Sequence, residues 1–365
     1  MSMGVSTVLF ASAVPARMDR DQTLPVRFQR LLDKLAMARR VKGRTVAIKM
    51  HLGGGMGYTT IRPLFVKLLV SHLREKGGAK DVFITDGDVS SAGDRGYAVQ
   101  TVGARLVPAC GKNWKNVRKV ATGWSALAGV QIGRPILDAD VLVNFSHVKG
   151  HGDCGFGGAC KNLAMGCVPP ATRGALHGLE GDLTWDKAKC VHCGKCIKEC
   201  EPKANKFTDK GEYVIFWHHC KGCAHCMLIC PTGAIRMSNR NFNLFQEGLA
   251  RVSMLVVNNF RKDDIFHINV LTDITPYCDC WGLSTPALVP DIGIMAAGDI
   301  VAVEEATLDA IKTRNVLPGS IVPPLTLGRG RHLFEKLHSR DPYAQPRLLE
   351  RLGAGTRKYR LVEVK

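Results

Sequence analysis

The first third of the chain alternates between segments with a helical spacing of apolar residues and short runs typical of buried strands. Apolar residues recur close to the helical period over 26–41 and again over 61–76, so each segment predicts a helix. The runs TVAIKM at 45–50 and DVFIT at 81–85 are short and apolar, and they predict buried strands. Because the second helix lies between these strands, this region predicts a parallel βαβ unit.

Similar patterns continue along the rest of the chain, with one interruption. The run DVLVNF at 140–145 predicts another strand. Apolar runs at 252–257, 265–271 and 300–303 predict three more strands, and the last is followed by a predicted helix over 304–312. Between these two groups lies a cysteine-rich segment of entirely different composition. The chain therefore predicts an α/β fold, with a mostly parallel sheet, into which another unit is inserted.

Eight of the fourteen cysteines fall in two runs with the same spacing. Each run reads C-x2-C-x2-C-x3-C, the spacing of two-cluster bacterial ferredoxins, in which the fourth cysteine of a run binds the other cluster. We therefore expect two 4Fe–4S clusters, the first held by Cys190, Cys193, Cys196 and Cys230 and the second by Cys220, Cys223, Cys226 and Cys200. The first run is less regular, because Glu201 separates Cys200 from Pro202.

Two other uses of cysteine fit this chain less well. Zinc sites use pairs of C-x2-C, without a third cysteine at the same interval followed by C-P. Disulfide frameworks are typical of small secreted chains, whereas this chain has 365 residues and no Lys or Arg before its apolar segment 5–14, as a secretory signal requires. No apolar run approaches the ~20 residues of a spanning helix. We therefore expect a cytoplasmic protein without a membrane span.

The length of the chain exceeds what one small core accommodates, so more than one folded unit is expected. We expect an α/β domain interrupted by a small ferredoxin-like α+β insert. The expected boundaries are 1–183 for the first part of the α/β domain, 184–240 for the two-cluster ferredoxin-like domain, 241–328 for the second part and 329–365 for a basic C-terminal tail.

The formal net charge of +18 points to an acidic partner. The segment 329–365 alone carries ten Lys or Arg against four Asp or Glu. It is either a solvated tail or a docking surface for an acidic electron carrier such as a ferredoxin or flavodoxin, which opposite charge would steer. Aromatic residues make up only 7% of the chain and no nucleic-acid-binding module is recognisable, so we expect no nucleic-acid partner.

Three polar segments each follow a predicted strand. The glycine loop 51–57, preceded by Lys49, lacks both the G-K-[ST] of a P-loop and the third glycine of a dinucleotide fingerprint. The segment 146–167 mixes six glycines with ionisable side chains, a composition that argues against a regular core element and is common in functional loops. The third segment, 273–280, contains Cys278 and Cys280, which are either buried free thiols or ligands for a metal or a thiol-reactive substrate.

Strand carboxyl ends converge on the ligand site in open α/β sheets. We therefore expect one cleft lined by His51, His147, Lys149, His151, Lys161 and Asn162, with Asp273 and Cys280 on its opposite wall. The alternative is that each polar segment is a separate solvated turn.

Three long stretches resemble the domain of unknown function 362 family of uncharacterised iron–sulfur-centre proteins. They read IKMHLGGGMGYTTIRP, HVKGHGDCGFGGACKNLAMGC and YCDCWGLSTPALVPDIGIMAAGDIVAVEEATLDAI, and the resemblance covers about 46–311. It implies an α/β fold with a bacterial-type two-cluster ferredoxin insert, but no settled activity. The pattern is also distantly similar to the lactate racemase group, in which His and Lys line a cleft between domains, an analogy at the level of the fold.

These observations leave three functional hypotheses. In the first, a ferredoxin-dependent oxidoreductase takes electrons through its clusters and reduces a small-molecule substrate or a second cofactor, with His and Lys stabilising negative charge and donating a proton. In the second, the chain is an electron-transfer module for a partner enzyme. In the third, the His-rich loop holds a metal without substrate turnover. The density of ionisable groups outside the cysteine runs favours the first hypothesis, and the sequence identifies no substrate.

Overall fold

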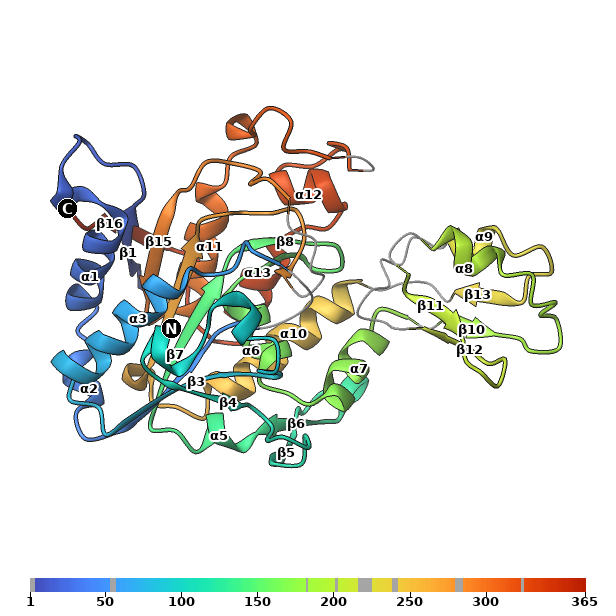
Figure 1. Cartoon of the computed structure of the whole chain (residues 1–365), viewed down its shortest axis with the longest axis horizontal. Helices are drawn as coiled ribbons and strands as arrows, with labels where there is room; N and C mark the ends of the chain where they lie inside the picture. Colours follow the sequence, from blue (N-terminus) through green and yellow to red (C-terminus); the bar gives the residue numbers. More distant parts are fainter. Residues whose placement is uncertain are drawn as a thin grey trace.

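An eight-stranded sheet forms the centre of the α/β domain in the computed structural model, which describes residues 4–52, 57–181, 183–200, 203–215, 225–237, 242–279, 285–322 and 325–365 (Figure 1). The strand order is β16-β1-β15-β14-β7-β2-β3-β4. Only β15 runs antiparallel to its two neighbours, and the other pairs in this sheet are parallel. The strands are β1 Ser6–Ser12, β2 Thr45–Lys49, β3 Asp81–Asp86, β4 Arg105–Pro108, β7 Val141–His147, β14 Ile265–Leu271, β15 Gly293–Ala297 and β16 Tyr359–Glu363.

The expected α/β fold with a mostly parallel sheet is therefore confirmed. The strands predicted at 45–50, 81–85, 140–145 and 265–271 are β2, β3, β7 and β14. The helix predicted over 61–76 is α3, Pro63–Ser71, extended by a π-helical turn, His72–Lys76. The helix predicted over 26–41 is divided into α1, Leu24–Lys34, and α2, Ala38–Val41, because Ala36 between them has a left-handed φ of 56°.

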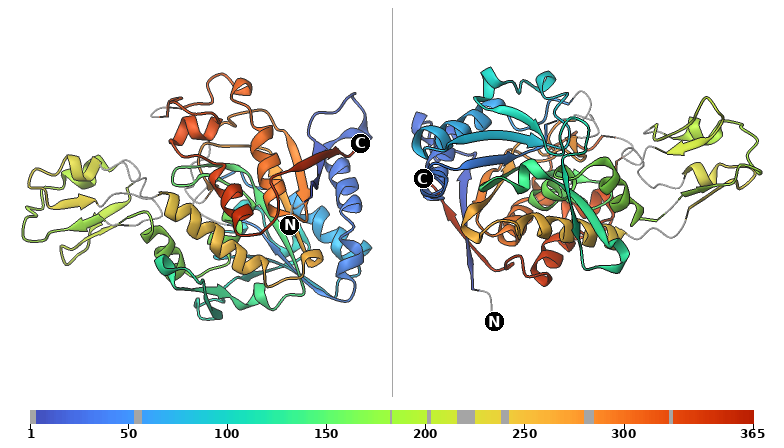
Figure 2. Two further views of the ribbon diagram at one scale, coloured as in Figure 1. Left: turned by 180° about the vertical axis from the view of Figure 1, so that it is seen from behind. Right: turned by 90° about the horizontal axis from the view of Figure 1, so that it is seen from below.

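Helices cover both faces of the sheet (Figure 2). Apolar residues of α1 and α3 pack with Val46 and Ile48 of β2 in one buried cluster. Ala47, which points to the other face, belongs to a second cluster with α6 Ala159–Gly166, α10 Phe242–Val257, α11 Ile300–Ala310 and α13 Ala344–Arg351. The remaining α-helices of the α/β domain are α4 Val99–Val102, α5 Arg134–Leu137, α7 Pro170–Gly178 and α12 Leu333–His338. This alternation places both faces of the central strands in apolar cores, as parallel sheets require.

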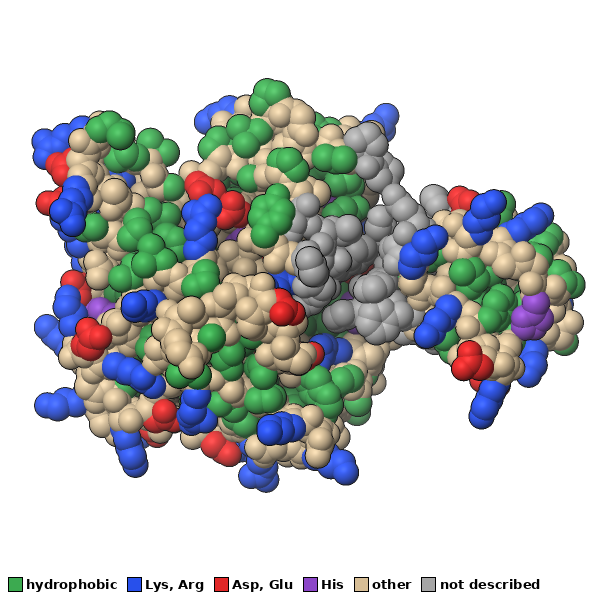
Figure 3. Space-filling view, viewed as in Figure 1, with side chains coloured by type: hydrophobic (Ala, Val, Ile, Leu, Met, Phe, Trp, Pro, Cys, Tyr) green, Lys and Arg blue, Asp and Glu red, His purple; other side chains and the backbone are tan. Residues whose placement is uncertain are grey.

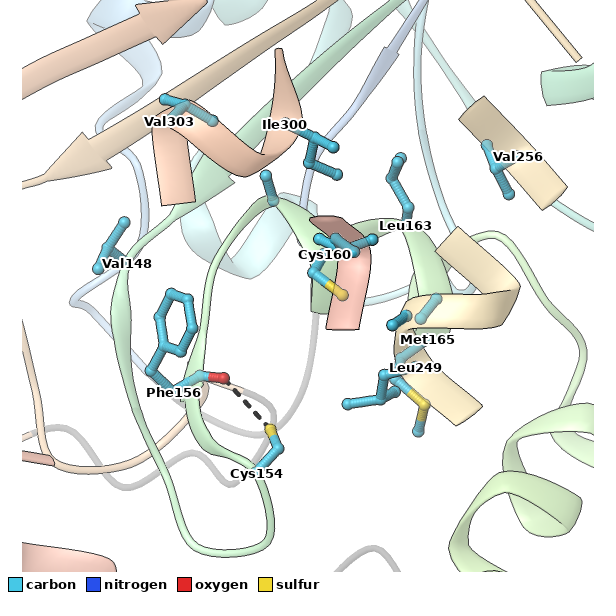
Figure 4. Packing of buried hydrophobic residues seen from close by; sticks show 14 of the residues in the cluster. Val148, Cys154, Phe156, Cys160, Leu163, Met165, Leu249, Val256, Ile300 and Val303 are labelled. Carbon is cyan, nitrogen blue, oxygen red and sulfur yellow. Dashed lines mark hydrogen bonds between the residues drawn. The ribbon is translucent and has the colours of Figure 1, made fainter. Parts of the chain in front are cut away.

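The second core surrounds α6, the helix that also contributes to the functional site (Figure 4). Cys160 and Leu163 of α6 are fully buried, together with Leu249 and Val256 of α10 and Ile300 of α11. This packing holds α6 firmly against the sheet and leaves its polar residues on the side that faces away from α10.

The cysteine-rich segment forms a small α+β insert that stands out from the α/β domain, beyond the ends of α7 and α10 (Figures 1 and 2). Two short antiparallel pairs join β10, Leu183–Trp185, to β13, Ile235–Met237, and β11, Asn205–Phe207, to β12, Tyr213–Ile215. The described part of the insert also contains two short helices, α8, Lys195–Glu199, and α9, His225–Leu228. The insert thus interrupts the α/β pattern between two helices that pack against each other.

Two of the predicted strands are wrong. The apolar run 252–257 is the end of α10, and 300–303 is the first turn of α11, which also contains most of the predicted helix 304–312. A short apolar run rich in β-branched residues does not distinguish a strand from a buried helix. In α10, buried residues recur at 245, 249, 252 and 256, which is a helical period that extends beyond the short run.

The prediction of a basic C-terminal tail at 329–365 is also wrong. This segment contains α12, α13 and the edge strand β16, which pairs in parallel with β1. Phe334 and Leu349 are buried in the second core and Val364 in the first, so the segment completes the sheet and both cores. Its charges lie on the exposed positions of otherwise amphipathic elements, which is why composition alone suggested a solvated tail.

The glycine-rich segment 146–167 differs from the expected irregular loop as well. It comprises the end of β7, a tight hairpin of β8, Lys149–His151, and β9, Gly155–Gly157, and then α6. The glycines permit close approaches: a Cβ on Gly150 would lie 2.2 Å from the Pro276 carbonyl oxygen, and one on Gly158 would lie 2.4 Å from a Glu304 carboxylate oxygen. The second hairpin of the α/β domain joins β5, Val117–Ala121, to β6, Gly129–Gly133.

Candidate functional site

Polar side chains gather at one edge of the sheet, where three neighbouring parallel strands end. Lys49 is the last residue of β2, Asp86 of β3 and His147 of β7. Because parallel strands end at the same edge, these residues come together although they are up to 98 positions apart in the sequence.

Lys49 and Asp86 form a buried ion pair. Lys49 Nζ lies 3.0 Å from Asp86 Oδ1 and donates a hydrogen bond to Asn162 Oδ1 at 2.7 Å, and the Lys49 side chain is only 1% exposed. His51 Nδ1 lies 3.0 Å from the other Asp86 oxygen. Burial alone would raise the pKa of Asp86, but the charge of Lys49 and the interactions with His51 outweigh it and lower this pKa. Asp86 therefore stays ionised and holds the side chains of Lys49 and His51 in place.

A glycine of α6 makes room for this pair. A Cβ on Gly166 would lie 2.2 Å from the Cε and Nζ atoms of Lys49. No side chain fits at this position without moving the ammonium group. On the same helix, Asn162 Nδ2 donates to Asn144 Oδ1 and to the Lys49 carbonyl, so α6 and the strand ends form one hydrogen-bonded unit.

A second buried carboxylate, Asp279, holds the next pair of bases. Asp279 Oδ2 lies 2.8 Å from His147 Nδ1 and 3.0 Å from Lys149 Nζ. His147 Nε2 faces the Thr272 carbonyl oxygen at 2.8 Å. Both ring nitrogens of His147 thus face hydrogen-bond acceptors. Burial would raise the pKa of Asp279, but His147 and Lys149 lower it.

The lysines and histidines of these two clusters, together with Asp86, line a cavity of about 260 Å³. The β8–β9 hairpin adds His151, whose Nδ1 accepts a hydrogen bond from the Asp153 backbone N–H at 3.1 Å. Beside the hairpin, Lys161 Nζ lies 3.3 Å from Cys278 Sγ. The cavity is lined by Lys49, His51, Asp86, Gly87, Asp88, His147, Lys149, His151, Asp153, Gly157, Gly158, Lys161, Asn162, Met165, Gly166, Arg173, His177 and Cys278.

The structure brings together six of the eight residues that the sequence placed in one cleft: His51, His147, Lys149, His151, Lys161 and Asn162. Asp273 does not line the cavity, and its carboxylate pairs with Arg62 at 2.9 Å, so its placement on the opposite wall is wrong. Cys280 lies outside the described residues. The neighbouring residue Cys278 lines the cavity, and Asp279 lies buried against His147 and Lys149.

Sequence reasoning missed several residues of the cavity. Asp86 could have been found, because it directly follows the predicted strand 81–85 and so occupies the same sheet edge. Arg173 and His177 lie on α7, which follows no strand, and only tertiary packing brings this helix to the cavity.

Three buried residues at the α7 side of the cavity are spaced as metal ligands would be. One ligand atom each of Asp153, His177 and Glu180 lies within 4.8 Å of the others. Oxygen and imidazole donors of this kind suit divalent ions such as Mn²⁺, Fe²⁺ or Zn²⁺. His177 Nδ1 lies 2.7 Å from Glu180 Oε1, and its ring stacks on Phe245.

The cysteines of the first expected cluster line one small cavity of the insert. Cys190, Cys193 and Cys196 meet there with Cys230, which comes from the second run. Aromatic residues surround them: Trp185, Phe207 and Tyr213 line the same cavity. Burial would raise the pKa of Cys230, but backbone N–H groups, that of Ile235 first, lower it. Such N–H groups are what cluster thiolates use, so these residues fit an iron–sulfur cluster.

The second expected set is only partly described. Cys200 and Cys226 lie in the described insert, and Cys200 Sγ accepts a hydrogen bond from the Ala204 backbone N–H at 3.2 Å. Cys220 and Cys223 lie outside the described residues. The described part of the chain also contains no helix that is both long and apolar enough to cross a membrane.

Comparisons with known proteins show a matching family, two curated relatives and a similar solved structure. The model of the family described as "Domain of unknown function (DUF362)" matches residues 46–309. Two curated relatives match only a short segment, and both are named pyruvate synthase subunit PorD. The protein from Methanocaldococcus jannaschii is 40% identical over 50 residues, and the one from Methanothermobacter marburgensis is 42% identical over 52 residues.

The matched segments are small parts of both partners. They cover 14% of this chain and 58% and 59% of the two relatives, so the chain spans less than two thirds of either. Among solved structures, the lactate racemase apoprotein from Thermoanaerobacterium thermosaccharolyticum aligns over 73% of this chain and 51% of its own. The TM-score is 0.35 and the sequence identity 13%. The short relatives and the cysteine spacing together indicate an iron–sulfur role in electron transfer.

Proposed function

This chain belongs to the DUF362 family, whose description names no activity, and we propose that it is an iron–sulfur oxidoreductase. It takes electrons through two 4Fe–4S clusters, at Cys190, Cys193, Cys196 and Cys230 and at Cys220, Cys223, Cys226 and Cys200, within an insert spanning 184–240. The electrons reduce a small substrate or a second cofactor in the cavity at the sheet edge. The observation that carries this proposal is the convergence of four lysine and histidine bases, with their buried carboxylates, on one cavity.

The residues of the cavity are suited to reductive chemistry. A substrate whose polar double bond gains two electrons must also gain two protons, one on each of the former double-bond atoms. His51 is held by the Asp86 carboxylate through Nδ1, and its Nε2 has no hydrogen-bond partner among the described residues, so this ring is positioned to pass a proton to a substrate. Both nitrogens of His147 already face acceptors, so its part is to hold Asp279 beside Lys149. Lys149 and Lys161 stabilise the negative charge that develops before the second proton arrives.

The insert is suited to receive electrons from an acidic carrier. The segment 184–240 contains ten Lys or Arg against five Asp or Glu, and Lys and Arg side chains project from the insert in Figure 3. Lys195 and Lys198 of α8 are exposed beside Cys193 and Cys196. We propose a ferredoxin or flavodoxin as the reductant, and a cytoplasmic location, where thiolate ligands stay reduced.

A second candidate function has its own support. The two short relatives carry the name of a pyruvate synthase subunit, which favours an electron-transfer module that serves a partner enzyme. In that case the cavity would not exchange electrons with a small molecule.

Re-oxidation of the reduced protein separates the two functions. The protein is reduced under anaerobic conditions, small molecules with polar double bonds are added, and the return of the cluster absorbance is followed. An oxidoreductase is re-oxidised by at least one such molecule, and Lys149→Ala loses this reaction while its iron content and its reduction by dithionite are unchanged. Re-oxidation by carrier proteins alone, with no effect of Lys149→Ala, would support the electron-transfer module instead.

A further inference from the structure

Arg173 differs from the other cationic residues of the cavity. Lys49 and Lys149 each lie 3.0 Å from a buried carboxylate oxygen. The Arg173 guanidinium, in contrast, forms neither an ion pair nor a side-chain hydrogen bond with any described residue, and its Nε is buried without an acceptor. A guanidinium that lines a cavity in this way still has its hydrogen-bonding capacity available.

The surroundings hold this guanidinium in place without neutralising it. It lies over the Trp114 ring, with 4.9 Å between Cζ and the ring centroid. Trp114 itself has a left-handed φ of 59°, which is costly for a bulky residue and persists only where the surrounding structure enforces it. Stacking leaves the edge of the guanidinium open to a ligand and reduces the entropy lost when the ligand binds.

A buried glycine leaves space beside the open edge. A Cβ on Gly87 would lie 3.2 Å from Arg173 Nη2, so a larger residue would crowd the group. Gly87 directly follows Asp86, so the free guanidinium lies next to the Lys49–Asp86–His51 unit. A ligand group bound by Arg173 would thus present its neighbouring atoms to the bases of the cavity.

We infer that Arg173 binds the carboxylate of a small substrate. This assignment rests on the proposal that the cavity is a substrate site, and it defines the substrate class. A planar guanidinium matches a carboxylate through two parallel hydrogen bonds. Asp86, Asp88 and Asp153 also line the cavity, so a singly charged carboxylate meets less repulsion than a phosphate with almost two charges. The cavity of about 260 Å³ is smaller than typical drug-sized sites, which favours a small acid.

The test measures binding of small acids to the oxidised protein with its clusters in place. Acetate, glycolate and glyoxylate are titrated by calorimetry, with glycolamide as the uncharged analogue and inorganic phosphate as the competing anion. At least one carboxylate should bind, glycolamide should not, and Arg173→Gln should weaken binding by about tenfold or more, because hydrogen bonds to charged groups are lost. Arg173→Lys, which keeps the charge but loses the planar fork, should show a smaller loss.

Arg118→Gln is the matched control. Arg118 lies on β5, pairs with Asp138 at 3.0 Å and does not line the cavity, so this variant should bind as the unmodified protein does. Thermal unfolding shows whether Arg173→Gln is folded. If Arg173→Gln does not fold, the binding of Arg173→Lys is compared with that of Arg118→Gln instead.

Three results would overturn the assignment: no carboxylate binds the unmodified protein, phosphate binds more tightly than every carboxylate, or the Arg173 variants bind as Arg118→Gln does. Iron content and bleaching by dithionite are measured on the same samples. If dithionite bleaches the clusters normally but no carboxylate binds, the carboxylate substrate is ruled out and the proposed electron transfer is unaffected. If carboxylates bind but the protein contains no iron, the proposed electron transfer is ruled out and the carboxylate site is unaffected.

Discussion

At the scale of single residues, the cavity depends on charges buried in pairs. Lys49 is almost fully buried, and Asp86 is its only carboxylate partner among the described ion pairs. Asp86→Asn would leave the ammonium unpaired in a low-dielectric site, so we expect the free energy of unfolding to fall by about 3–5 kcal/mol. Denaturant unfolding of the α/β domain measures this. Asp88→Asn is the control, since Asp88 is exposed two residues away and should change stability by less than about 0.5 kcal/mol. Equal effects of the two variants would contradict the role of the pair.

The cysteines allow a second prediction at this scale. The purified protein should carry about eight iron and eight sulfide per chain. Cys230→Ala removes one of the four cysteines that line the first cavity, so iron should fall to about four per chain while the second cluster remains. Iron and sulfide analysis, with spectroscopy of the remaining cluster, measures this. Cys160→Ala provides a control, because Cys160 is buried in the core between α6 and α10 and should leave the iron content unchanged. Zinc in place of iron would contradict the cluster assignment altogether.

At the scale of elements, Glu304 connects α11 to the start of α6, where it accepts a hydrogen bond from the Ala159 backbone N–H. Burial raises the pKa of Glu304 to about 7, and backbone hydrogen bonds only partly oppose it. In the unfolded chain this carboxyl group has its ordinary pKa of 4.5 and loses its proton above that pH, whereas in the folded protein it keeps the proton until about pH 7. The free energy of unfolding should therefore fall by about 3 kcal/mol as the pH rises through this window.

Glu304→Gln should remove this decrease, because the amide cannot ionise but its oxygen can still accept the Ala159 hydrogen bond. Denaturant unfolding at about pH 5 and about pH 8 gives the difference between the two proteins. Glu247→Gln, which alters an i,i+4 pair with Arg251 on α10, should retain the pH dependence of the unmodified protein. The same slope in all three proteins would show that Glu304 does not titrate in this range.

At the scale of the whole molecule, the charge is distributed over folded surfaces and not in a tail. If the insert receives electrons from an acidic carrier, the rate of reduction should fall steeply as salt rises, since the Debye length is about 8 Å at 0.15 M salt. Stopped-flow reduction by a ferredoxin or flavodoxin at several salt concentrations measures this. Replacing Lys195 and Lys198 by Gln should lower the rate at low salt, whereas Lys34→Gln on α1, at the other end of the molecule, should not (Figure 1). A rate independent of salt would leave the charge without this role.

The sequence by itself determined the elements whose signals are local. Period and composition predicted β2, β3, β7, β14 and α3, and cysteine spacing predicted which four cysteines meet at the cavity of the insert. It also predicted that six polar residues would meet, because ends of parallel strands share an edge whatever packs around them.

Only the tertiary structure decided which apolar runs are helices, that the C-terminal segment joins the sheet, and which further residues complete the cavity. The runs 252–257 and 300–303 are helical, and β16 pairs with β1, more than 350 positions away. Arg173 reaches the cavity through the packing of α7, while Asp273 is held outside it by Arg62. A local pattern records which face of an element is apolar, but the partner of that face is chosen by contacts between distant segments.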